Sequence, residues 1–134
     1  MSDDRQLVSS GSEWEQAVGF SRAIRVDRFV SVSGTTATDS RGHPVGIGRV
    51  EVQTEYIIRK IEHALHEVGA TLNDVVRTRI YVIHAGDWEA IGRVHGKYFG
   101  EIRPANTLIE VSKIVGEEYL VEIEADAILP LSTG

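Results

Sequence analysis

The sequence predicts an α+β fold in which two helices pack on one face of a mostly antiparallel, six-stranded sheet. The expected elements follow the order β-β-β-α-β-α-β-β. Residues 119–129 alternate between apolar and polar side chains, as a half-buried strand requires, and residues 50–68 carry an apolar stripe at helical spacing. Since residues 1–134 are enough for one core and no linker divides them, a single domain is expected.

The first third of the chain is expected to be mostly strand. Residues 6–10 can form a short edge strand, and residues 11–16 are expected to be a polar connection. A hairpin is predicted over residues 20–33, with its turn at residues 26–28. It is followed by Gly34, which permits another segment or a ligand to approach the backbone closely. A tight bend alone is the commoner reason for such a glycine.

Two helices are predicted, at residues 50–68 and 87–99, with a strand rich in β-branched residues between them at 75–83. The apolar stripe of the first helix consists of Ile57, Ile61, Ala64, Leu65 and Val68. Asp87 can cap the second helix. The inward side of the second helix is expected to hold Trp88, Ile91, Val94 and Tyr98.

The last two strands are expected within residues 103–129, joined by a turn at residues 116–118. One face of the final strand carries Glu122, Glu124 and Asp126, which recur every two residues and are therefore about 6.7 Å apart. Their mutual repulsion favours cations beside this carboxylate row, a proton on one member, or full solvation of a charged outer face.

Arg77 and Arg79 share one face of the preceding strand and are natural neighbours of the carboxylate row if the two strands lie in one sheet. Two helices can cover only one sheet face, so the face with the row is left open. Oligomerisation through that face is the economical solution.

Composition limits the classes of function. The net charge is −6, from 14 basic and 20 acidic residues, which disfavours a nucleic-acid partner because a grip on phosphates needs clustered cations. No cysteine is present, which excludes thiolate nucleophiles and cysteine-ligated zinc. No apolar leader follows Met1 and no apolar run approaches about 18 residues, so a cytoplasmic protein without a membrane partner is expected.

Three motifs together resemble the Rid family, the YjgF-type reactive intermediate deaminases. They are Ser33-Gly34, Arg103-Pro104-Ala105 and the Leu-Val-Glu-Ile-Glu run at residues 120–124. The resemblance covers nearly the whole chain. It implies a chorismate-mutase-like fold and a homotrimer with a small-molecule cleft between subunits. In deaminating members, these clefts hydrolyse enamines or imines, and no cofactor or metal is used.

The resemblance also assigns site residues. It implies that Glu122 activates the attacking water, and that Phe20, Ser33 and Gly34 line the ligand-binding cleft. Asn106 stands where deaminating members carry an arginine that clamps the substrate carboxylate, which makes this chain a divergent member. Arg22 shares a strand face with Phe20 and is the candidate replacement cation; a surface or interface ion pair is the alternative for Arg22.

Two functions follow from these assignments. The first is a RidA-like hydrolase of enamines, imines or related reactive metabolites, with Glu122 as general base. The second is a non-catalytic ligand-binding trimer, either a metabolite sensor or the partner of an enzyme, which the loss of the arginine favours. Endoribonuclease activity is a third reading, which the acidic charge disfavours.

Overall fold

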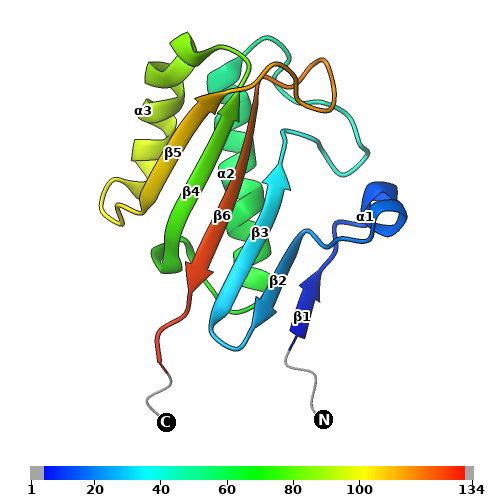
Figure 1. Ribbon diagram of the computed structural model, residues 1–134, viewed down its shortest axis with the longest axis vertical. Coiled ribbons are helices and arrows are strands. Elements are labelled where there is room, and N and C mark those ends of the chain that lie inside the picture. The colour runs from blue at the N-terminus through cyan, green and yellow to red at the C-terminus, as the bar shows by residue number, and fades with distance from the viewer. Residues whose placement is uncertain (1–4, 132–134) are drawn as a thin grey trace.

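The structure, a computed structural model, describes residues 5–131. Its strands are β1 (Arg5–Val8), β2 (Ala23–Val26), β3 (Phe29–Thr35), β4 (Val75–Val82), β5 (Ala105–Glu110) and β6 (Val121–Ile128). Its helices are α1 (Glu13–Val18), α2 (Val50–Glu67) and α3 (Trp88–Phe99), with short 3-10 turns η1 (Leu72–Asp74) and η2 (Ala85–Asp87). The strands form one sheet in the order β1-β2-β3-β6-β4-β5, and α2 and α3 lie on the same face of it (Figure 1). The predicted α+β architecture is confirmed.

The core lies between the sheet and α2. Every residue of the predicted stripe on α2 is buried. The residues of β6 that face this helix are buried as well: Val121, Ile123, Ala125 and Ala127. Full burial of each large aliphatic side chain contributes about 1.5–3 kcal/mol, so the alternation of β6 fixes which of its faces meets the helices. Gly69 follows α2 with a φ of 84°, a left-handed conformation that suits glycine at a helix end.

The last two strands form as predicted, but they are not neighbours in the sheet. β4 lies between β5 and β6, pairing with β5 in parallel and with β6 antiparallel. The reason is α3, which returns the chain to the N-terminal end of β4. The next strand, β5, therefore runs in the same direction as β4. Residues 111–120 then bring the chain across to β6.

Two local expectations were wrong. Residues 11–16 are not merely a connection, because α1 starts at Glu13, after an N-cap in which Ser12 Oγ accepts from Trp14 N at 3.1 Å. α1 has no apolar stripe, but the Ser12–Glu15 spacing and Gly19 are cap signals that could have revealed it. Trp88, expected to face inward, is 59% exposed: it is the first residue of α3, whose buried residues are Ile91 and Phe99.

The face of the sheet opposite α2 and α3 carries the carboxylate row. Arg79 lies directly across from Glu124 in the register of β4 and β6, as expected, and Arg77 lies across from Asp126. Phe29 on the same face is 59% exposed and Ile109 47%. This face is therefore half apolar and uncovered in the single chain. Among residues 5–131, no helix is long and apolar enough to cross a membrane.

Candidate active site

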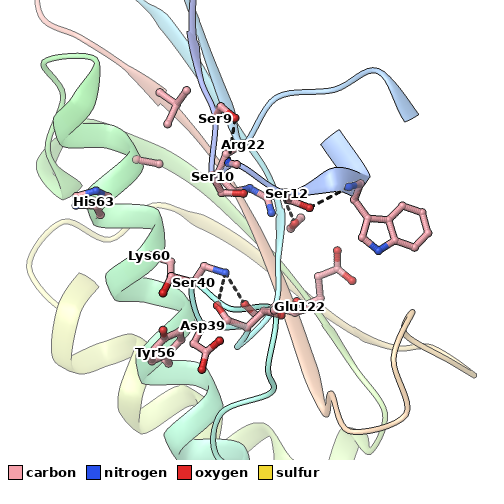
Figure 2. Close-up of a pocket in the computed structure, with 18 of the residues that line it drawn as sticks. Ser9, Ser10, Ser12, Arg22, Asp39, Ser40, Tyr56, Lys60, His63 and Glu122 are labelled. Carbon is pink, nitrogen blue, oxygen red and sulfur yellow. Dashed lines mark hydrogen bonds between the residues drawn. The ribbon is translucent and has the colours of Figure 1, made fainter. Parts of the chain in front are cut away.

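A hollow of about 1060 Å³ opens at the end of the sheet where β3 stops. Its walls come from the segment that leads into α1, the end of β3, the loop that follows β3, the outer turns of α2, and β6. Figure 2 shows side chains from these separate segments converging, with Lys60 reaching from α2 while Arg22 and Glu122 come from the sheet side. The hollow thus collects charged groups that are far apart in the sequence.

Gly34 and Glu122 lie next to each other in this wall. The pairing of β3 with β6 shifts register between Val32 and Thr35, so Gly34 lies in an irregular part of β3. The Glu122 carboxylate fills the space next to Gly34, and a β-carbon built on Gly34 would collide with Glu122 Oε2. The close approach that a glycine permits here is therefore made by a side chain of the same protein.

Arg22 lies on the other side of Gly34. Its Nη2 donates to the Gly34 carbonyl at 2.6 Å, and its guanidinium lies 5.7 Å from the centre of the Phe20 ring. Its Nε is buried and makes no hydrogen bond to residues 5–131. Burial lowers the pKa of Arg22, against the opposing charges of Glu15 and Glu122. No ion pair holds Arg22 within the described chain, and Arg22 is one of the residues that line the hollow.

The Glu122 carboxylate is half-buried and has no ion pair or hydrogen bond to residues 5–131. Burial raises its pKa above the ordinary glutamate value, and the charge of Glu124 acts in the same direction, while Arg22 opposes both. The other two members of the row share one cation: Arg79 Nη1 lies 3.4 Å from Glu124 Oε1 and 3.0 Å from Asp126 Oδ2. Of the row, Glu122 alone enters the hollow.

The remaining predicted site residues lie elsewhere. Ser33 does not line the hollow; its hydroxyl donates to the Ser21 carbonyl at 2.7 Å and so holds the bend beside Gly34. Asn106 lies on β5, two strands from Glu122, and its amide donates to Thr78 Oγ1 at 2.9 Å. Thr78 is buried under α3, where its hydroxyl also bonds His95 Nε2 at 2.9 Å. One chain therefore brings together Phe20, Arg22, Gly34 and Glu122, but not Ser33 or Asn106.

Lys60 is a site residue that the sequence analysis missed. Its Nζ donates to the carbonyls of Thr36 at 3.1 Å and Thr38 at 2.9 Å. Burial, and next the charge of Arg22, lower its pKa to about 8. The available signal was its position: Lys60 follows Ile57 by three residues and precedes Ala64 by four, which places it on the buried stripe of α2.

Glu15 was also missed. It is buried on α1 and accepts hydrogen bonds from Ser9 Oγ at 3.1 Å, from Ser10 N at 3.1 Å and from the Ser10 hydroxyl. Burial raises the pKa of Glu15, but the bonds from Ser10 and Ser9 outweigh burial and lower it. It anchors the segment that forms one wall of the hollow. Among residues 5–131, no group of three or more histidine, aspartate and glutamate side chains is arranged to hold a metal ion.

The fold and this site define a small α+β protein of the chorismate-mutase-like type, with a charged hollow beside the end of β3. The chain belongs to the YjgF/YER057c/UK114 family, also called the Rid or RutC family. The family model described as endoribonuclease L-PSP matches residues 11–129. The family resemblance read from the three motifs is thereby confirmed.

Relatives and solved structures agree with this assignment. The crystal structure of Rv2704 from Mycobacterium tuberculosis is 47% identical, covers 93% of this chain and 99% of that chain, and superposes with a TM-score of 0.85. A RutC family protein of Pyrococcus abyssi is 36% identical over 108 residues, 81% of this chain and 84% of the relative. The 3-aminoacrylate deaminase RutC of Acinetobacter baylyi is 33% identical over 105 residues, 78% of this chain and 82% of the relative.

Proposed function

We propose that the protein hydrolyses small imines or enamines with a water molecule activated by Glu122. The position of this carboxylate carries the proposal, since it is half-buried in the hollow and no residue in 5–131 neutralises it by an ion pair. A carboxylate in such a place can accept a proton from water. Its raised pKa, caused first by burial, makes it a stronger base than an exposed glutamate.

The chemistry needs only protons and water. An enamine first takes a proton on carbon and becomes an iminium ion. Water adds to the iminium carbon while Glu122 accepts one of the water protons. Glu122 then returns that proton to nitrogen, and the carbon–nitrogen bond breaks as the added oxygen forms the carbonyl group. The hydroxyl proton passes to the departing ammonia, which leaves as ammonium. Positive charge on Arg22 is suited to hold an anionic group of the substrate on the far side of Gly34.

The relatives support the reaction class. The Acinetobacter baylyi relative is named as a deaminase, and the match to it spans 78% of this chain. The proposed assembly is a homotrimer that covers the open sheet face. In it, Phe20, Arg22 and Gly34 bind the ligand, while Ser33 supports the bend from behind. Asn106 contributes only if the assembly brings the β5 edge of a neighbouring subunit to the hollow.

A second function is favoured by the surroundings of Asn106. Its amide is engaged by Thr78, and no arginine stands at that position to clamp a carboxylate. A trimer that binds a small polar ligand without turnover would need the hollow but not an arginine that clamps a carboxylate. Endoribonuclease activity, which the family model carries in its description, is opposed by the net charge of −6.

The deciding experiment measures imine loss. An amino-acid oxidase generates 2-imino acids from several amino acids, and the wild-type protein is added while ammonia and carbonyl product are followed. Acceleration over the uncatalysed decay supports the hydrolase. If no imine is accelerated but the same compounds or their carbonyl products raise the melting temperature, the non-catalytic function is correct instead.

A further inference from the structure

We propose that Lys60 is a covalent capture site for small carbonyl compounds. Its side-chain amine would condense with the carbonyl carbon of a 2-oxo acid that enters the hollow. The nitrogen lone pair forms the new carbon–nitrogen bond, both amine protons pass to the carbonyl oxygen, and that oxygen leaves as water. The product is an imine that joins the ligand to Lys60. This inference is independent of the chemistry proposed for Glu122.

The placement of Lys60 favours this role. The residue lies on the stripe of α2 that otherwise faces the core, between the buried Ile57 and Ala64. Its stem is therefore confined by packing, while its nitrogen reaches the wall of the hollow (Figure 2). A long side chain fixed in this way presents one atom to a ligand with little loss of rotamer freedom.

The hydrogen bonds of Lys60 suit a neutral amine as well as an ammonium ion. Two N–H groups are used, one for the Thr36 carbonyl at 3.1 Å and one for the Thr38 carbonyl at 2.9 Å. A neutral amine has two N–H groups and one lone pair. Removing the third proton of the ammonium ion therefore breaks neither bond, and it exposes the lone pair that must attack a carbonyl carbon.

The surroundings of Lys60 favour the neutral amine on balance. No carboxylate in residues 5–131 forms an ion pair with its nitrogen, although the charges of Glu15 and Asp39 raise its pKa from a distance. Burial, and then the neighbouring charge of Arg22, lower its pKa to about 8, so that about a tenth of the amine is neutral at neutral pH. An ordinary lysine is neutral in fewer than about one molecule in a thousand under the same conditions.

The surroundings favour a carbonyl compound that carries an anionic group. Arg22 and Arg59 both line the hollow, and the Nε of Arg22 is buried without a partner among the described residues. A carboxylate next to the carbonyl can be held by a guanidinium while the carbonyl carbon meets the Lys60 nitrogen. Tyr56 and His63, from the adjacent turns of α2, complete this wall.

The chain offers its own controls, because its only lysines are Lys60, Lys97 and Lys113. Lys97 is exposed and forms an ion pair with Glu55 at 3.0 Å, and the hydrogen bond with Glu55 raises its pKa. An amine held as ammonium in this way should react poorly. A comparison among the three lysine-containing peptides therefore separates capture in the hollow from general amine reactivity.

The test is reductive trapping. The full-length protein is incubated with pyruvate and cyanoborohydride near neutral pH, and the lysine-containing peptides are compared by mass spectrometry after Glu-C digestion. We expect labelling of Lys60 to exceed that of Lys97 and Lys113 by roughly tenfold or more, following the difference in neutral amine. Equal labelling of the three, or preference for either of the others, would overturn the proposal.

Two control experiments accompany this test. Lys60→Arg keeps the cation and its hydrogen bonds but offers no condensing amine, so the label at residue 60 should vanish while Lys97 and Lys113 keep their background. In wild-type protein unfolded in urea, the preference for Lys60 should disappear because the hollow no longer exists. Persistence of the preference in urea would show that local sequence causes it, and would also overturn the proposal.

Discussion

The Glu122 carboxylate lies in the space that a side chain at Gly34 would fill, so these two residues depend on each other. Gly34→Ala should push the flexible end of Glu122 aside rather than move the backbone, because the collision is with the carboxylate oxygen. We expect the free energy of unfolding to change by less than about 1 kcal/mol, while imine hydrolysis falls by about tenfold or more. Urea unfolding and the ammonia assay measure the two quantities. Full activity in the variant would show that the space beside Gly34 is not needed for hydrolysis.

Glu122→Gln should abolish hydrolysis, because an amide cannot accept the proton from water. Loss of a general base lowers rates by about 100- to 10,000-fold. The matched control is Glu124→Gln, which changes the same residue type on the same face of β6 but outside the hollow, where Glu124 contacts Arg79 and Tyr81. The control should retain activity, and light scattering should show the same assembly for both. If the Glu122→Gln protein had wild-type turnover, Glu122 would not be the general base and its role would be structural.

The lowered pKa of Lys60 should make the free energy of unfolding depend on pH. Its pKa is about 8 in the folded chain and ordinary in the unfolded chain, so between these two values the unfolded state binds more protons. The free energy of unfolding should therefore rise with pH across this window. Lys60→Met should lack this contribution. Urea unfolding at about pH 7.5 and about pH 9.5 tests the difference, and an equal pH response in both proteins would contradict it.

Asn106→Arg tests whether the missing clamp limits activity. If the trimer brings the β5 edge of a neighbouring subunit to the hollow, the gain on carboxylate-bearing imines should be roughly one to two orders of magnitude, because charge-assisted bonds contribute more than neutral ones. Thr78 loses its amide partner in the variant but keeps the bond to His95. Asn106→Gln is the control, since it lengthens the side chain without adding charge. Strong wild-type activity that survives Arg22→Ala would show that no cationic clamp is needed.

The open face of the sheet predicts the assembly. The exposed side chains of Phe29 and Ile109 lie on this face together with the ion pairs of Arg79. Burying such a mixed face between subunits stabilises an oligomer. Light scattering at micromolar concentration should give about three times the chain mass of 14.8 kDa. Phe29→Glu should lower that mass by placing a charge in the interface, and a wild-type monomer would contradict the proposed trimer.

The sequence by itself determined the six strands, the two long helices and the inner faces of α2 and β6. The stripe of α2 and the alternation of β6 are local patterns, and each reports which side of its own element is buried. The same patterns made Arg79 a neighbour of the carboxylate row, on the condition that the two strands share a sheet, and gave close approach as one of two reasons for Gly34. They could not tell that β4 lies between β5 and β6, because strand neighbours are chosen by contacts distant in sequence.

Only the tertiary structure decided which charges meet. In the sequence, Lys60 is one polar residue within an apolar stripe. In the fold, α2 packs beside the segment that follows β3, where the carbonyls of Thr36 and Thr38 accept hydrogen bonds from Lys60. The place of Asn106 is likewise set by strand pairing, since its strand pairs with β4 and its amide donates to Thr78 in the single chain. Burial and the field of distant charges set the pKa values of Glu122 and Lys60, and both arise only when separate segments come together.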